Sequence, residues 1–259
     1  MRPSPLRSYP DKPDEVYFFG TCLVDVLYPE AGLAAVELIE REGVRVIFPQ
    51  GQTCCGQPPF NSGYREEARS VARSQLALFP KPIPIVVPSG SCGAMLRVHY
   101  PGLFQDADPE LAAEARAMAE RVFEWSEFMV EVLGAKLTDS GPPLTVTYHP
   151  SCHLVRELGV REPPLALLRQ LGQVELRPLP EAEECCGFGG TFAVKYATIS
   201  GAMVEDKCRT VEESGADLLV TVDCGCLMHI AGAMAKAGQK TGAKPLPLFL
   251  KERTHASHS

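Results

Sequence analysis

Glu184-Cys185-Cys186-Gly187-Phe188-Gly189-Gly190 and the earlier Thr53-Cys54-Cys55-Gly56-Gln57-Pro58 are the two stretches from which the fold is predicted. Each holds a pair of adjacent cysteines followed by glycine. Each pair also has one cysteine upstream, with 31 or 32 residues between them, and another downstream, with 36 or 39 residues between them. The sequence therefore contains a four-thiol module twice, offset by 130 to 134 residues. The two quartets are Cys22, Cys54, Cys55 and Cys92, and Cys152, Cys185, Cys186 and Cys226.

The composition is that of a globular protein. The 259 residues are 45% apolar and 22% charged, with a net charge of −7. This length allows one large domain or two of ordinary size. The acidic balance and the lack of a basic run argue against a nucleic-acid partner. No apolar stretch approaches the ~20 residues that span a bilayer, so we expect no membrane span.

The ten cysteines need an explanation other than disulfide bonds. Residues 1–15 lack the apolar core of a secretory signal. We expect them to form a mobile arm and the chain to be cytoplasmic, where thiols stay reduced. Many cysteines in such a compartment are typical of metal binding or redox chemistry. A lone cysteine such as Cys208 is instead expected to be a small buried core residue.

Strands and helices alternate in the same order in both halves. Strand-forming runs occupy 16–19, 44–48 and 83–87, and again 144–148, 174–179 and 216–222. Helical patterns cover 31–42, 64–79, 164–171 and 191–214, with Leu33 and Tyr64 on the apolar faces. Asp108 and Ser126 are expected to cap two further helices. Residues 138–143 have the composition of a linker.

This alternation predicts an α/β protein with mainly parallel sheets. We expect two lobes related by a pseudo-twofold axis, residues 16–138 and 144–259, each a small sheet with flanking helices. All eight repeated cysteines follow predicted strands. Because the carboxyl ends of parallel strands meet at one edge of a sheet, each half is expected to gather four thiolates at one site.

Thiolates are soft ligands that select zinc, Cu(I) or iron–sulfur clusters. A structural zinc site usually takes two Cys-x2–4-Cys knuckles, a pattern the sequence lacks. Adjacent cysteines more easily contact different metal atoms of a larger cluster. Glycine and proline residues around the cysteines permit the backbone to approach a bound cluster closely and leave amide groups free to point at sulfur. They are Gly56, Pro58, Gly187, Gly189 and Gly190. The pattern favours an iron–sulfur cluster, with a zinc-stabilised scaffold as the alternative.

The cysteine spacing resembles the duplicated cysteine-rich "CCG" domain. That domain occurs in heterodisulfide reductase, in the iron–sulfur subunit of glycolate oxidase and in lactate-utilisation iron–sulfur proteins. The resemblance extends from about Val16 to Leu250. The runs Cys185-Cys186-Gly187-Phe188-Gly189-Gly190-Thr191-Phe192 and Gly225-Cys226-Leu227-Met228-His229 are most similar to the lactate-utilisation branch.

The resemblance implies that the eight repeated cysteines ligate one or two clusters per chain, of the [4Fe–4S] type. The fuller family pattern ends each half in Cys-x-x-Cys, whereas this chain has Ser89 and Asp223 at the first of those positions. Cys224 is a candidate additional ligand. Whether Ser89, Asp223 or Cys224 ligates stays open, as does whether both halves bind metal.

The implied function is that of an iron–sulfur electron-transfer subunit in a cytoplasmic complex that oxidises L-lactate or another 2-hydroxy acid. The chain lacks both a close-packed ferredoxin cysteine motif and a Gly-x-Gly-x-x-Gly motif. Its partners are therefore expected to be other subunits, including a ferredoxin-like iron–sulfur protein, and the chain need not be catalytic alone. The alternative is cluster-based thiol–disulfide reduction, as in the heterodisulfide reductase relatives.

Six polar residues near the cysteines are further candidates: His149, His153, His99, His229, Lys195 and Arg156. His149 and His153 could pair as zinc ligands, but we favour a role for both as polar neighbours of the second site. For His99 and His229 we favour surface positions over a role near sulfur. Lys195 and Arg156 are charge partners for an anionic cluster or acidic substrate, or simply solvated helix residues.

Overall fold

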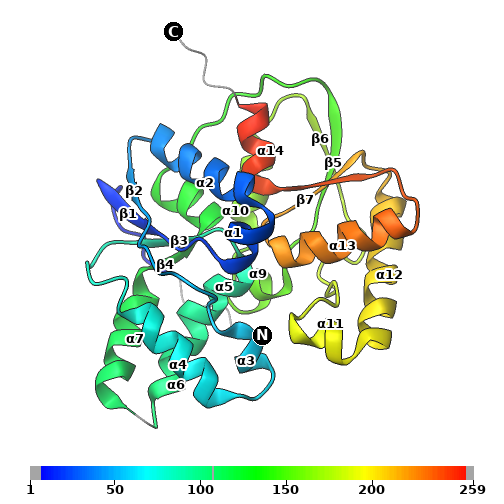
Figure 1. Ribbon diagram of the computed structural model, residues 1–259. Helices are drawn as coiled ribbons and strands as arrows, with labels where there is room; N and C mark the ends of the chain where they lie inside the picture. Colours follow the sequence, from blue (N-terminus) through cyan, green and yellow to red (C-terminus); the bar gives the residue numbers. More distant parts are fainter. Residues whose placement is uncertain (1–6, 107, 255–259) are drawn as a thin grey trace.

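Two sheets of four parallel strands form the framework of the protein, one in each half of the chain (Figure 1). The computed structural model describes residues 7–106 and 108–254. The first sheet has the order β2-β1-β3-β4 and the second β6-β5-β7-β8. The strands are β1 (Glu15–Phe18), β2 (Arg45–Ile47), β3 (Ile85–Val87), β4 (Val122–Glu124), β5 (Leu144–Tyr148), β6 (Val174–Arg177), β7 (Leu218–Thr221) and β8 (Gly242–Pro245). The predicted α/β class with two similar lobes is confirmed.

The fourth strand of each sheet was not predicted. β4 pairs with β3 and β8 pairs with β7, both in parallel and both at a sheet edge. β4 has only three residues, and the β8 residues Gly-Ala-Lys-Pro lack the apolar alternation of a strand. Proline is tolerated at the end of an edge strand because its missing N–H is not needed there.

Helices cover both faces of the sheets and connect successive strands (Figure 1). Two short segments are π-helices, η1 (Met95–His99) and η2 (Phe128–Val132). In the first half the α-helices are α1 (Cys22–Leu27), α2 (Pro29–Arg41), α3 (Gln57–Asn61), α4 (Arg65–Leu76), α5 (Gly90–Ala94), α6 (Tyr100–Phe104), α7 (Pro109–Arg121) and α8 (Trp125–Glu127). In the second half they are α9 (Cys152–Arg156), α10 (Glu162–Leu168), α11 (Thr191–Lys195), α12 (Ala197–Ser214), α13 (Cys224–Lys236) and α14 (Leu246–Arg253).

Four local expectations were wrong. Tyr64 is 55% exposed, because it precedes α4 and its ring faces the Lys195 ammonium instead of the core. Leu33 points outward while its neighbours Ala34 and Ala35 are buried. Ser126 lies inside α8, whose cap is Glu124, because β4 runs directly into this helix. The helix expected over 191–214 is broken at Tyr196, which has non-helical backbone angles (φ −126°, ψ 49°) and joins α11 to α12.

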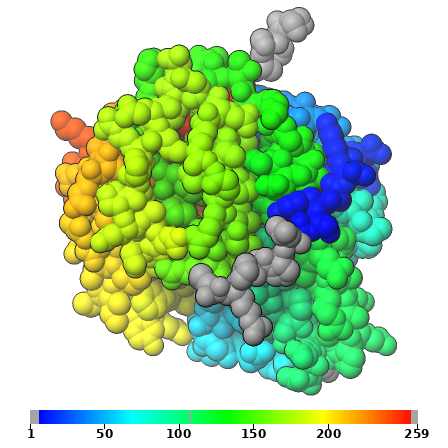
Figure 2. Space-filling model, turned by 180° about the vertical axis from the view of Figure 1, so that it is seen from behind, coloured from blue at the N-terminus to red at the C-terminus, as the bar shows by residue number. Residues whose placement is uncertain are grey.

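One hydrophobic core is shared by the two lobes. It contains Leu38 and Phe128 from the first half and Leu167 and Phe249 from the second. Helices pair across the interface in a twofold pattern: α14 packs on α2, and α8 with η2 packs on α10. Seen from behind, yellow-green atoms of the second half lie directly against atoms of the first half (Figure 2). Each lobe also has a separate core on its outer side.

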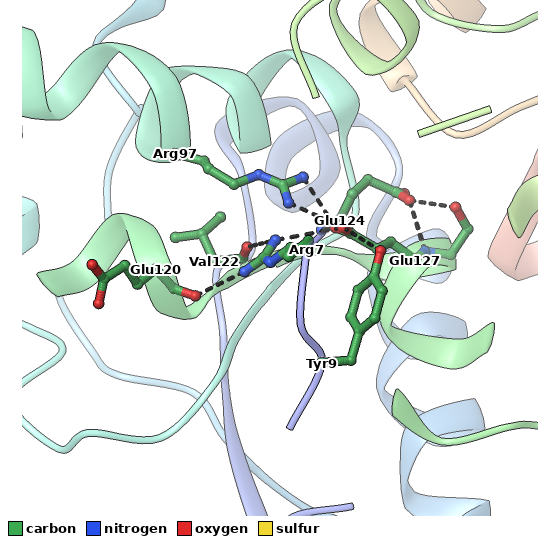
Figure 3. A network of polar contacts seen from close by, with 8 residues as sticks. Arg7, Tyr9, Arg97, Glu120, Val122, Glu124 and Glu127 are labelled. Atoms are coloured by element: carbon green, nitrogen blue, oxygen red, sulfur yellow. Dashed lines mark hydrogen bonds and ion pairs between the residues drawn. The ribbon is translucent and has the colours of Figure 1, made fainter. Parts of the chain in front are cut away.

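The linker and the described part of the N-terminal arm are both held by contacts. In the linker, Asp139 forms a buried ion pair with Arg253 at 2.7 Å, and Ser140 donates to the Arg253 carbonyl. Residues 1–6 of the expected arm lie outside the described residues. From Arg7 onward the arm is anchored, because Arg7 donates to the Val122 carbonyl at 2.9 Å (Figure 3).

A buried carboxylate pair lies beneath this arm (Figure 3). Glu127 receives both guanidinium nitrogens of Arg97 at 3.0 Å and the Arg7 guanidinium at 3.4 Å. Glu124 accepts the backbone N–H groups of Ser126 and Glu127 through one oxygen. Its other oxygen has no hydrogen-bond partner among the described residues, and burial raises the pKa of Glu124 to about 7. The surroundings of Glu124 therefore disfavour its charged form.

None of the helices in residues 7–106 and 108–254 combines the length and apolar character that crossing a bilayer requires.

Candidate metal centre

The cysteines follow the carboxyl ends of three strands in each sheet and so lie at one edge of that sheet. Cys22 follows β1, Cys54 and Cys55 follow β2, and Cys92 follows β3. In the second half Cys152, Cys185 with Cys186, and Cys226 follow β5, β6 and β7. After β1 the chain forms β2 on one side of it and then crosses to form β3 on the other side. β5 lies between β6 and β7 in the same way. Such a switch point is where open parallel sheets bind ligands.

All eight repeated cysteines line a single cavity between the lobes. The two sheet edges face each other, so the site that we expected in each half opens onto this shared space. The cavity encloses about 160 Å³. That is roughly ten times the 10–15 Å³ that one water needs on the same measure, so the space exceeds the need of a single ion.

Within each quartet the thiols lie in a chain of contacts. The sulfur of Cys55 is 3.4 Å from that of Cys92, and Cys186 is 3.3 Å from Cys226. Cys152 lies 3.9 Å from Cys185. The second cysteine of each adjacent pair is buried against the cysteine that follows the third strand. The first member of each pair is half-buried and faces the cysteine that follows the first strand.

One thiol in each lobe is strongly biased toward the thiolate. A hydrogen bond from Cys22, and then one from Cys55, lowers the pKa of Cys54 to about 3. Hydrogen bonds from Cys152 and Cys186 likewise lower the pKa of Cys185 to about 2. The thiolate is the form that binds metals, so Cys54 and Cys185 are held in the form that metal binding requires.

Four helices begin at or next to a cysteine that lines this cavity. Cys22 and Cys152 are the first residues of α1 and α9, and Cys92 and Cys226 are the third residues of α5 and α13. The unpaired N–H groups at a helix N-terminus carry partial positive charge and favour anions. Four such ends around eight thiols are suited to a group of negative charge.

Glycine shapes both cysteine loops. Gly56 and Gly187 each have a φ of +84°, which other residues rarely adopt. A Cβ on Gly187 would also lie 2.8 Å from the carbonyl oxygen of Ser200. Each loop thereby packs closely on the helix behind it, α4 or α12.

Ser89 and Asp223 connect the two lobes. The Ser89 hydroxyl donates to the Asp223 carboxylate at 3.0 Å, and the Ser91 backbone N–H donates to the same oxygen at 2.9 Å. The other Asp223 oxygen accepts the Gly225 N–H and caps α13, while Ser89 caps α5. The carboxylate is thus occupied by three donors. Two residues that the sequence left as candidate ligands therefore make contacts of their own across the interface.

The two remaining cysteines lie in different places. Cys224 is buried and lines the shared cavity, where burial raises its pKa. It stays a candidate ligand. Cys208 is buried in the outer core of the second lobe, as expected.

His149 is the histidine closest to the thiols. It is 1% exposed, and its ring nitrogen and the sulfurs of Cys186 and Cys226 all lie within 4.8 Å of one another. Neither ring nitrogen has a hydrogen-bond partner in the described part of the chain. Burial lowers the pKa of His149 to about 3, so the ring is neutral. Its position directly after β5 was the sequence signal for a neighbour of the site.

The other polar candidates make mainly local contacts. His153 places a ring nitrogen 3.5 Å from the Cys152 sulfur, and His99 contacts Glu157 at 2.7 Å. The half-buried His229 contacts the Ser200 hydroxyl at 3.1 Å. Arg156 donates to the Glu183 carbonyl, and Lys195 lies 5.3 Å from the ring centre of Tyr64.

The residues present fit a thiolate-bound metal group. The donors are soft sulfur atoms, which suit iron–sulfur clusters and zinc and not hard cations. Both ring nitrogens of His149 lack, among the described residues, the hydrogen-bond partner that buried polar groups usually have.

Three comparisons with known proteins found related sequences and a related fold. A cysteine-rich domain, CCG, matches residues 16–97 and 146–231. Lactate utilization protein A of Geobacillus kaustophilus (strain HTA426) is 48% identical over 87% of this chain and 93% of its own length. The protein of that name from Bacillus velezensis is 47% identical over 92% of this chain and 100% of its own length. A hypothetical protein from Helicobacter pylori shares the fold, with a TM-score of 0.62 at 13% identity, over 98% of this chain and 53% of that one.

Proposed function

The chain belongs to the cysteine-rich CCG domain family and is a relative of lactate utilization protein A, and from this we propose that it is an iron–sulfur electron-transfer subunit of a lactate-oxidation system. The observation that carries the proposal is the convergence of eight repeated cysteines on one cavity. Within this proposal, each quartet ligates its own centre. The partners are other subunits that exchange electrons with this chain, among them a ferredoxin-like iron–sulfur protein.

The side chains around the cavity suit this role. An iron–sulfur cluster, when bound, accepts and releases single electrons at a potential set by its surroundings. Cys54 and Cys185 supply thiolates, the four helix N-termini offset negative charge, and Ser89 with Asp223 fixes the spacing of the two lobes. Fixed surroundings keep the change in geometry between redox states small.

Metal analysis tests the first part of the proposal. Protein purified without oxygen should contain iron and acid-labile sulfide in matching amounts. C55S and C186S remove equivalent buried thiols from the two lobes, so each should lose part of the iron, while C208S should lose none. Zinc without sulfide would instead support a zinc-stabilised scaffold.

Growth on lactate tests the second part. A Bacillus velezensis strain that lacks its lactate utilization protein A should regain growth on lactate when it carries this chain, and not when it carries C55S or C186S. A wild-type chain that is produced with iron bound but fails to restore growth would contradict the lactate role.

Thiol–disulfide reduction at the cluster is the second candidate. The observation that favours it is the low pKa of Cys54 and Cys185, which are both half-buried and line the cavity. A nucleophilic thiolate is what attack on a disulfide needs. Reduction of a disulfide by the iron-loaded protein, together with no growth on lactate, would favour this candidate over the first.

A further inference from the structure

The two thiol quartets have matching backbones but different surroundings. A Cβ on Gly56 would meet the Val71 side chain and the carbonyl oxygen of Ala68. A Cβ on Gly187 would meet Met203 and the carbonyl oxygen of Ser200 in the same way. Ala68 in α4 therefore corresponds to Ser200 in α12, and the two helices can be compared residue by residue.

Seven residues further along each helix, two turns on, lie Gln75 and Lys207. Both are fully buried, at 0% and 1% exposure. Both reach back to the loop that carries the cysteine pair. Gln75 donates to the Thr53 hydroxyl at 2.9 Å, and the Lys207 ammonium donates to the Glu181 carbonyl at 2.8 Å. The first lobe thus has a neutral amide where the second has an ammonium group.

The Lys207 ammonium lies close to the second quartet. With Cys185 it lines a second cavity, of about 270 Å³. Burial lowers the pKa of Lys207, while Glu184, Cys186, Glu181 and Cys185 oppose that shift.

The acidic groups nearby do not cancel this charge. Glu181 and Glu184 are exposed, so water and salt screen them. Asp223 is the buried charge on the interface side, and it is already compensated by three hydrogen-bond donors. A buried charge acts through a medium of low dielectric constant, so Lys207 is the less screened group.

We propose that Lys207 is a positioning residue that raises the reduction potential of the second-lobe centre, and that the two lobes are electronically unequal because Gln75 cannot do the same for the first. The inference rests on the proposed function. One-electron reduction adds one negative charge to a centre and makes or breaks no bond. A nearby fixed positive charge stabilises that reduced state.

Redox titration of the iron-loaded full chain, followed by electron paramagnetic resonance, tests the proposal. C55S and C186S first assign the signals to the two lobes. K207Q should then lower the midpoint potential of the second-lobe signal and leave the first unchanged. K207R, which keeps the charge, should restore the wild-type value. Q75K should raise the first-lobe potential.

A second-lobe potential that K207Q leaves unchanged would overturn the inference, as would equal shifts of both signals. Iron present in only one lobe of the wild-type chain would also overturn it. If K207Q fails to fold or to bind iron, Q75K decides, because the absence of an upward first-lobe shift contradicts the proposal. A wild-type chain without iron refutes the proposed function itself, and iron analysis shows this before any titration.

Discussion

The substitution E124Q should remove a pH-dependent loss of stability. Glu124 is fully buried at the end of β4, and its burial raises its pKa from 4.5 to about 7. The folded state therefore keeps a proton that the unfolded state releases between these two pH values. Because the folded state binds more protons there, the free energy of unfolding falls as pH rises.

The size of this loss of stability follows from the difference of about 2.5 pH units between the pKa values of Glu124 in the unfolded and folded states. At about 1.36 kcal/mol per unit, ionisation of Glu124 costs the folded state about 3 kcal/mol once the pH exceeds 7. Glutamine keeps an oxygen that can accept the backbone N–H groups of Ser126 and Glu127 but carries no charge. E124Q should match the wild type near pH 4 and be about 3 kcal/mol more stable at pH 8.

Urea unfolding of the metal-free full chain at pH 4.5, 6 and 8, under reducing conditions, measures this difference. Burial also raises the pKa of Glu127, whose contribution to the pH dependence is common to both proteins. E131Q changes an exposed glutamate one turn away and should leave the pH dependence as it is. If the free energy of unfolding of E124Q falls with pH as steeply as that of the wild type, the reasoning about Glu124 is wrong.

Three further substitutions test other contacts. R97M removes the bidentate partner of buried Glu127 and should cost about 3 kcal/mol in urea unfolding, whereas R97K, which keeps the charge, should cost less. G187A and G63A share a φ of +84°, but only the first crowds a backbone oxygen. Thermal unfolding should therefore show about 1 kcal/mol lost for G63A and clearly more for G187A. S89A leaves the Asp223 carboxylate without one donor and should cost about 2 kcal/mol, while S91A keeps its backbone N–H contact and should cost less; equal losses would contradict the role given to Ser89.

The sequence predicted the framework because strands and cysteines repeat at nearly constant offsets. The order of Cys22, Cys54, Cys55 and Cys92 after three strands was enough to place all four at one sheet edge. β4 and β8 were missed because edge strands of three or four residues carry little apolar pattern. Tyr64 was misplaced since a helical stripe does not reveal where the helix begins.

The environment of the thiols was less predictable than their positions. That both quartets would share one cavity depends on how the lobes pack, which no local pattern encodes. The contact between Ser89 and Asp223 joins residues 134 positions apart. Lysine is usually an exposed residue in a helix, and only the packing of α12 buries Lys207. Such features arise from tertiary contacts between segments that are far apart in the chain, and the sequence of neither segment predicts the contact.

The packing of helices from each lobe against the other lobe bears on the origin of the chain. α14 covers α2, and α8 with η2 covers α10, so each half completes the apolar surface of the other. A single-lobe ancestor could have buried that surface only by forming a symmetric homodimer. Fusion of two copies would have retained the dimer contact and freed each half to diverge. A fragment containing one half alone is accordingly expected to self-associate instead of persisting as a monomer.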